Sequence, residues 1–270
     1  MKSLNRQEGS FHSSLWLSLW GIRCVWLRYF DVFKKSLLYY AVTTLTEPIL
    51  YLFSFGLGVG SLIGSIQFHG QSISYQSFIF SGIIGQTLLF QGFFEASYGG
   101  FIRMYYQKIF QAMSVTPITL SEVLWGELLW DSTKATLTAE AVVLIGMLIG
   151  DFPAISLITL LPLLFISALL FSSLGLAVAG FSKSIEQISY PQYLLIFPMF
   201  LFCGVFYPIE QLPHTLQILA WALPLTSINS LSRWITLGGP FQPQTVPILF
   251  VWLIGLVWLA RRTMFKRLVK

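Results

Sequence analysis

Six stretches of this chain are apolar over about the length that a helix needs to cross a lipid bilayer. A membrane-spanning helix takes about 20 mostly apolar residues, because the hydrocarbon core is roughly 30 Å thick. The stretches cover residues 37–63, 78–98, 124–149, 155–181, 187–207 and 246–264. Prolines interrupt the fifth and crowd the start of the sixth. The sequence therefore predicts an all-α polytopic membrane protein with six transmembrane helices.

Composition excludes a soluble enzyme. Only 10% of the residues are charged and 55% are hydrophobic, whereas a soluble domain carries roughly a quarter charged residues. The net charge of +5 would suit nucleic acid only if the basic residues gathered on one exposed face. Their spread along the chain favours a membrane instead, so we expect no nucleic-acid partner.

The motifs of common catalytic and cofactor sites are missing from the sequence. There is no GxxxxGK[ST] phosphate loop, no HExxH zinc motif and no GxSxG nucleophile elbow. The histidines His12, His69 and His214 lack ligand spacing, and Cys24 and Cys203 form no CxxC site. We expect no catalytic, cofactor-binding or metal-binding residues, so any ATP dependence must come from a partner.

The basic residues predict the orientation, since short cytoplasmic loops are enriched in Lys and Arg. Fourteen of the 16 fall before the first span, between the second and third, between the fourth and fifth, or in the last turn and tail of the sixth, from Arg261 on. The exceptions are Lys134 within a span and Arg233 on the other face. We expect both termini on the cytoplasmic side of the inner membrane.

The segment 1–35 predicts a helix lying in the membrane interface. Its polar residues fall on one stripe, while Trp16, Trp20 and Trp26 lie elsewhere on the helix, at headgroup depth. Arg23 and Arg28 interrupt the apolar stretch, which excludes a cleavable signal peptide. The alternative, a seventh span, would bring Arg23 near the bilayer centre.

The loop between the second and third spans predicts a short amphipathic helix at the cytoplasmic surface. Its apolar residues recur at helical spacing at positions 102, 105, 106, 109, 110 and 113. Thr116-Pro117 ends it, and Thr119 with Glu122 forms a capping box for the third span. Such a helix either transmits a push to the span or simply packs on the membrane surface.

The third span is unusually polar. One stripe of this helix carries Glu127, Asp131, Lys134 and Thr138. Asp131 and Lys134 can pair at i,i+3. We expect Glu127 and Asp131 to reach the cytoplasmic headgroups. Glu140 on this span and Glu47 on the first fall near the midplane. Buried ionisable groups face the bundle interior or a water-filled cavity. The five ionisable residues, without Thr138, either line a pathway or form a structural buried pair.

The outer segment 207–243 is too apolar for a solvated loop. Prolines divide it into two short helical pieces, which fits a re-entrant helical hairpin acting as a gate. We place the outer gate at Phe206, Pro208 and Pro213. An amphipathic hairpin resting on the outer leaflet is the alternative. On the first span, Gly56, Gly60 and Gly64 form a packing face, within or between subunits.

Three parts of the sequence carry recognisable motifs. They are AMSVTP at 112–117; Gly126-Glu127 with Trp130 and TKA at 133–135; and GVFYPIEQLP at 204–213 with LPLT at 223–226. These segments resemble the membrane subunits of type-2 ABC exporters, in particular the nodulation lipo-oligosaccharide exporter (NodJ-like) branch. The resemblance covers most of the chain from about residue 30.

This resemblance implies a homodimer, surrounded by membrane lipids and bound to two copies of a cytoplasmic ABC ATPase that supplies ATP and Mg. The loop would then couple to the ATPase through Arg103, Tyr106, Gln107, Phe110, Met113, Thr116 and Pro117. The domains would be an N-terminus (1–35), a six-span domain (36–264) with a coupling loop (99–121) and the outer segment (207–243), and a basic tail (265–270).

The implied cargo is amphipathic: a lipo-oligosaccharide, a lipid-linked glycan or a polysaccharide. Related permeases also export drugs, so a drug or antibiotic efflux permease is an alternative. A self-sufficient ion-coupled carrier or channel, using Glu47, Glu140 and Lys134 as a relay, is another. An intramembrane enzyme would need catalytic pairs that the sequence does not contain.

Overall fold

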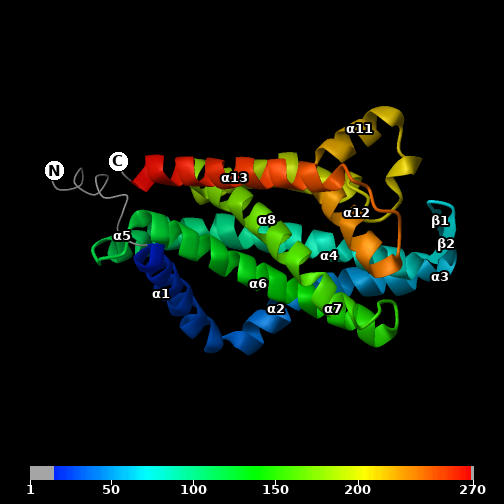
Figure 1. Cartoon of the computed structure of the whole chain (residues 1–270), viewed down its shortest axis with the longest axis horizontal. Helices are drawn as coiled ribbons and strands as arrows, with labels where there is room; N and C mark the ends of the chain where they lie inside the picture. The colour runs from blue at the N-terminus through cyan, green and yellow to red at the C-terminus, as the bar shows by residue number, and fades with distance from the viewer. Residues whose placement is uncertain (1–14, 269–270) are drawn as a thin grey trace.

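The computed structural model of the protein describes residues 15–268 as a helical bundle (Figure 1). Along the chain its elements are α1 (Leu15–Lys34), α2 (Leu37–Tyr51), η2 (Leu52–Val59), α3 (Gly60–Ile63), β1 (Ser65–Phe68), β2 (Gln71–Ser74), α4 (Tyr75–Phe94), η3 (Glu95–Gly99), η4 (Ile102–Tyr106), α5 (Ile109–Ser114), α6 (Leu120–Ile149), α7 (Ser156–Thr159), α8 (Leu161–Phe181), η5 (Ile185–Ile188), α9 (Ser189–Pro191), η6 (Gln192–Ile196), α10 (Phe197–Phe202), η7 (Ile209–Gln211), α11 (His214–Ala222), α12 (Pro224–Leu237) and α13 (Thr245–Leu268). Residues 1–14 and 269–270, which include Lys2, Arg6, His12 and Lys270 of the predicted termini, lie outside the described residues.

Five helices of the described chain are long and apolar enough to cross a membrane. They cover Leu37–Ile63, Tyr75–Tyr106, Leu120–Ile149, Ser156–Phe181 and Thr245–Leu268. The second runs eight residues further than its predicted end at residue 98, because the π-helical segments η3 and η4 continue α4. The predicted fifth span breaks into η5, α9, η6 and α10 around its prolines. The protein is thus a polytopic all-α membrane protein, and the sixth span stays a prediction.

The centre of the bundle is built by α4, α6 and α8, with α13 packed along α8 (Figure 1). Two glycines allow α4 and α8 to approach each other closely. A Cβ on Gly92 of α4 would lie 3.0 Å from the Cβ of Phe171, and one on Gly175 of α8 would lie 2.5 Å from the carbonyl oxygen of Phe93. Small residues at a helix crossing permit this kind of backbone contact in membranes. The buried phenylalanines of α4 and α8 then fill the space around it.

Helix α1 packs against the first half of α6. A Cβ on Gly126 would lie 2.5 Å from the Cβ of Val25, so the α6 backbone lies directly against the Val25 side chain of α1. The Trp26 indole N–H donates a hydrogen bond to Thr133 (3.1 Å), and Trp26 lies edge-on to Trp130. The Trp26 indole N–H is therefore bound by a hydroxyl of α6. The predicted helix is present from residue 15 to 34, and its depth in a membrane stays a prediction.

Gly56 and Gly60 pack within the chain. A Cβ on Gly56 would lie 3.8 Å from Gln76, and one on Gly60 would lie 3.8 Å from Tyr75, so η2 and α3 rest on the start of α4. Gly64, at φ +69°, ends the helix. The contacts of Gly56 and Gly60 agree with packing of this glycine face within the subunit. Packing between subunits stays a prediction.

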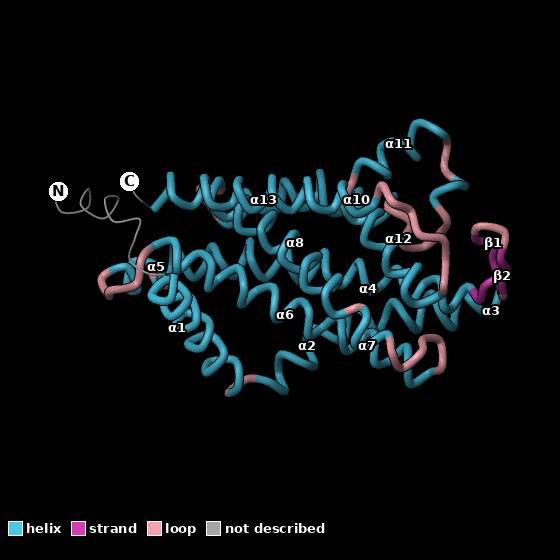
Figure 2. Tube along the Cα trace, in the orientation of Figure 1, coloured by secondary structure: helices cyan, strands magenta, loops and turns pink. Residues whose placement is uncertain are grey.

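A two-stranded antiparallel hairpin, β1–β2, joins the first two spans (Figure 2). Its turn residues His69 and Gly70 both have positive φ (48° and 79°), as a type I′ turn requires. At the same end of the bundle the two helical pieces predicted after the fifth span are present as α11 and α12. The re-entrant insertion of this pair stays a prediction.

The contact of Gly175 with α4 predicts a strong response to one added methyl group. We expect Gly175→Ala to lower the free energy of unfolding by about 1–3 kcal/mol, because a backbone carbonyl cannot move aside as a side chain can. Gly255→Ala is the matched control, since no described atom lies within 4 Å of a Cβ there. Thermal and denaturant unfolding of both variants in the same detergent measures the difference. Equal stability of the two variants would contradict the close packing of α4 and α8.

Candidate functional site

A buried group of five charged side chains joins the second and third spans. Glu95 begins the π-helical segment η3 and Arg103 lies in η4, while Glu127, Asp131 and Lys134 lie on α6. We call these five residues the ion cluster. π-Helical turns inside a longer helix often mark functional sites. Two π-helical segments follow α4 here: η3 carries Glu95, and η4 carries Arg103.

Arg103 is the centre of the ion cluster. Its Nη1 donates to Glu95 Oε1 (2.8 Å), its Nη2 to Asp131 Oδ1 (3.0 Å) and its Nε to Glu127 Oε1. The Arg103 side chain is 13% exposed, and those of Glu127 and Asp131 are fully buried. A planar guanidinium presents its donors in a fixed fork, so this one residue fixes three carboxylates at once. Glu127 and Asp131 are thus paired with Arg103 inside the bundle, and their predicted depth at the headgroups stays a prediction.

Lys134 binds Glu95 rather than Asp131. Its Nζ forms an ion pair with Glu95 Oε1, the oxygen that also accepts from Arg103. The predicted i,i+3 pair of Asp131 with Lys134 is therefore absent from the described chain. Asp131 turns to Arg103 instead, so the contacts join α6 to the second span rather than α6 to itself.

The ion cluster holds three carboxylates and two cations. Within the described chain, Glu127 Oε2 and Asp131 Oδ2 are buried without a hydrogen-bond partner. A buried charge without full compensation is costly in a medium of low dielectric constant. These two oxygens are the free acceptors of the cluster.

Aromatic rings lie beside both cations of the ion cluster. The Arg103 guanidinium lies 5.5 Å from the ring centre of Tyr29, and Lys134 Nζ lies 5.5 Å from that of Tyr40 and 5.7 Å from that of Trp130. Burial, together with the negative charge of Glu127, raises the pKa of Tyr29 on α1 well above its usual range. The Tyr29 phenol therefore stays neutral beside the carboxylates.

The loop after the second span differs from its prediction. Instead of one helix over 102–113, η4 ends at Tyr106, and Lys108 adopts a left-handed conformation (φ 52°) that turns the chain into the separate helix α5. Arg103 consequently belongs to the membrane-spanning run and not to a surface helix. The predicted capping box is confirmed: Thr119 and Glu122 bond each other's backbone at the start of α6.

Exposure divides the predicted coupling residues into two groups. Arg103 lies in the ion cluster, and Phe110 and Met113 are buried where α5 packs on the bundle. The exposed residues are Tyr106, Gln107, Thr116 and Pro117, together with Val115, which is 87% exposed. Only this second group is free to touch a partner, so Phe110 and Met113 serve to hold α5 in place.

The remaining predicted polar residues lie apart from the ion cluster. Glu47 on α2 and Glu140 on α6 are both partly buried, and neither forms an ion pair with another described residue. Glu140 Oε1 is buried without a hydrogen-bond partner in the described chain. The structure brings neither carboxylate into an ion pair with Lys134, which Glu95 occupies.

The predicted gate residues surround the break in the chain after α10. Phe206 packs between Phe55 (ring centres 4.5 Å apart) and Phe200 (5.1 Å), Pro208 is buried, and Pro213 is exposed at the start of α11. Two α12 side chains reach this break: Asn229 donates to the carbonyl of Cys203 (2.9 Å) and Arg233 to that of Gly204. The helical hydrogen bonds lost at the break are thus replaced from α12.

Sequence reasoning missed Glu95, Tyr29, Asn229 and Arg233 as contributors to these two sites. Glu95 is the one that the sequence could have indicated, because it lies inside the predicted second span and an intramembrane carboxylate indicates a buried partner. For Tyr29, Asn229 and Arg233 no local pattern distinguishes a buried polar contact from a surface position.

Comparison with known proteins agrees with this architecture. A family model described as "ABC-2 type transporter" matches residues 21–237. The chain belongs to the ABC-2 type transporter family. Nodulation protein J of Rhizobium leguminosarum bv. viciae is 32% identical to it over 80% of this chain and 82% of the relative. That of R. leguminosarum bv. trifolii is 31% identical over 91% and 93%. Inner membrane transport permease YadH of Escherichia coli (strain K12) is 26% identical over 79% and 84%.

Membership in the ABC-2 type family defines the chain as the membrane subunit of an ABC exporter and a multi-pass protein of the inner membrane. The family implies partnership with a separate ABC ATPase. In such a subunit, the ion cluster lies directly beside the loop that continues into α5.

The two contacts of Glu95 Oε1 predict an energetic coupling that the sequence pattern alone would assign elsewhere. A double-mutant cycle of Lys134→Met with Glu95→Gln is expected to give an interaction energy of about 0.5–3 kcal/mol in the free energy of unfolding. The control cycle pairs Lys134→Met with Asp131→Asn, and we expect a clearly smaller value because no ion pair joins those side chains. A larger coupling with Asp131 would contradict the observed pairing.

Proposed function

We propose that this ABC-2 type permease exports an amphipathic cargo of the lipo-oligosaccharide, lipid-linked glycan or polysaccharide class across the inner membrane. The observation that carries the proposal is the similarity to Nodulation protein J, which extends over 91% of this chain and 93% of one relative. The corresponding branch of type-2 exporters moves lipo-oligosaccharides, and similarity along nearly the whole length favours a related cargo.

The working unit that we propose is a homodimer with two copies of a cytoplasmic ABC ATPase. The partner binds ATP and Mg, since the sequence of this chain contains no phosphate loop. Both termini lie on the cytoplasmic side, where the positive-inside rule puts the basic residues. The end of α13 lies at the same end of the bundle as α5, which agrees with this orientation (Figure 1).

The ATPase docks on the exposed part of the coupling loop, at Tyr106, Gln107, Thr116 and Pro117. Phe110 and Met113 bury α5 against the bundle, and the Thr119 capping box fixes the start of α6. A displacement of the loop is therefore carried into the second span, where Arg103 holds α6. The ion cluster thus links ATPase movement to the relative position of two spans.

Transport with purified components tests the proposed function. We expect proteoliposomes holding the chain and its ATPase to move a lipo-oligosaccharide only when ATP and Mg are present, and to stop when the ATPase is omitted. An ion gradient without ATP should drive no transport. Export of drugs but not of lipid-linked glycans would favour the efflux alternative, and gradient-driven movement by the chain alone would contradict the exporter proposal.

The docking surface predicts different effects for two exposed tyrosines. Tyr106 (61% exposed) lies on the coupling loop, and Tyr190 (65% exposed) lies on α9, outside it. We expect Tyr106→Ala to weaken ATPase co-purification and ATP-driven transport about tenfold, as loss of a buried aromatic anchor does at an interface, while Tyr190→Ala retains both. Unfolding temperatures of the two variants control for folding. Equal losses would contradict docking on residues 99–121.

A further inference from the structure

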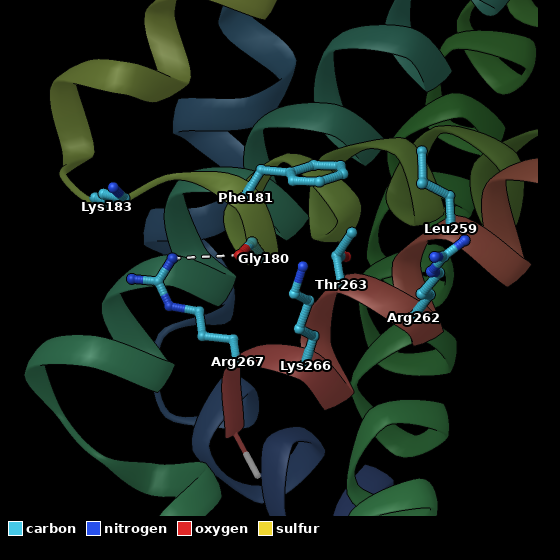
Figure 3. Close-up of a pocket in the computed structure, with 8 residues that line it drawn as sticks. All are labelled: Gly180, Phe181, Lys183, Leu259, Arg262, Thr263, Lys266 and Arg267. Atoms are coloured by element: carbon cyan, nitrogen blue, oxygen red, sulfur yellow. Dashed lines mark hydrogen bonds between the residues drawn. The ribbon is translucent and has the colours of Figure 1, made fainter. Parts of the chain in front are cut away.

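A cavity of about 550 Å³ opens between the end of α8 and the last turns of α13. Figure 3 shows Lys266 and Arg267 extending from α13 toward the end of α8, where Phe181 and Lys183 lie. Arg262 and Leu259 complete the wall on the α13 side, and Leu259 and Phe181 are its large apolar side chains. A volume of this size lies within the range of ligand pockets in proteins.

Three of the basic side chains around this cavity are free to bind an anion. Within residues 15–268, no carboxylate lies within 4 Å of the side-chain nitrogens of Lys183, Arg262 or Lys266. Arg262 and Lys183 are exposed, as is Lys266. Several unpaired cations around one hollow create a field that attracts a negative group.

Arg267 has a different part in the same cavity. Its Nη1 donates to the carbonyls of Ala179 (3.3 Å), Gly180 (3.3 Å) and Ser182 at the end of α8. The carbonyl end of a helix carries partial negative charge, which would oppose an anion. Because Arg267 binds these carbonyls, the cavity keeps its positive character next to a helix end.

An apolar stripe leads from the cavity along α13. Val251, Ile254, Trp258 and Arg262 are spaced as i, i+3, i+7 and i+11 and so share one helix face. The first three are 71%, 68% and 57% exposed, and the Arg262 guanidinium lies 5.1 Å from the Trp258 ring centre. A tryptophan between an apolar stripe and a basic group is typical of the membrane interface.

We propose that this cavity binds the phosphate headgroup of an anionic phospholipid, whose acyl chain lies along the stripe of Val251, Ile254 and Trp258. Lys183, Arg262 and Lys266 bind the phosphate, and Arg267 shields it from the carbonyls of α8. Basic pockets between membrane helices bind anionic lipid headgroups in this manner. A soluble phosphate would use the same cations but would gain nothing from the apolar stripe, which favours the lipid. The site is independent of the cargo proposed above.

Lipid binding to the full-length chain in detergent tests the proposal. Native mass spectrometry compares phosphatidylglycerol with phosphatidylcholine of the same acyl chains, and we expect the former to bind at least about tenfold more tightly. The triple variant Lys183→Gln, Arg262→Gln, Lys266→Gln should lose most of this preference. The control variant Arg23→Gln, Lys35→Gln, Arg261→Gln removes the same charge from exposed positions outside the cavity and should retain it.

Two further measurements keep the test decisive. Lys183→Arg with Lys266→Arg preserves the charge and should preserve the lipid preference. In the wild-type chain, a photoactivatable phosphatidylglycerol should label peptides from the ends of α8 and α13, whether or not the triple variant folds. Labelling elsewhere, an unchanged preference in the triple variant, or an equal loss in the control would overturn the proposal. Full displacement of the lipid by glycerol phosphate at equal concentration would overturn the lipid as ligand in favour of a soluble phosphate.

Discussion

Arg103 carries a charge that the interior of a membrane protein tolerates only when it is fully paired, and the packing of the second and third spans depends on this pairing. Its guanidinium contacts Glu95, Glu127 and Asp131, which come from both spans. Removing one partner from a buried ion group costs about 3–5 kcal/mol, because the remaining charge is left uncompensated. Sliding or rotation of one span against the other would separate these charges, so the two helices are held in one register at this end.

The contacts around the ion cluster extend this constraint to other helices. Tyr29 brings α1 onto the cluster, and the close contact at Gly126 keeps α1 against α6. On the opposite side, Gly175 joins α8 to the start of the π-helical segment that carries Glu95. Backbone contacts without intervening side chains leave little room for adjustment. These contacts therefore hold α1, α6, α8 and the second span in one arrangement around the ion cluster.

Much of the fold follows from the sequence, because long apolar runs and the Thr119 capping box are local signals. The pairing within the ion cluster is not local. The spacing of Asp131 and Lys134 allows a pair on one helix, but Glu95 takes Lys134 because η3 and η4 set how the second span faces α6. No periodicity indicates π-helical turns, or the left-handed Lys108 that separates α5 from the span. The sequence thus identified the charged stripe of α6 but not its partner.

The end of the bundle that carries α12 is held by interactions of another kind. Arg233 on α12 is almost fully buried, yet it binds the neutral oxygens of Ser81 and Gly204 and lies 3.7 Å from the Phe78 ring centre. Within the described chain no carboxylate forms an ion pair with it. Its hydrogen bonds are charge-assisted on the donor side only, because both acceptors are neutral. Arg233 therefore holds the break after α10 without a counter-charge, whereas Arg103 joins two spans through three carboxylates.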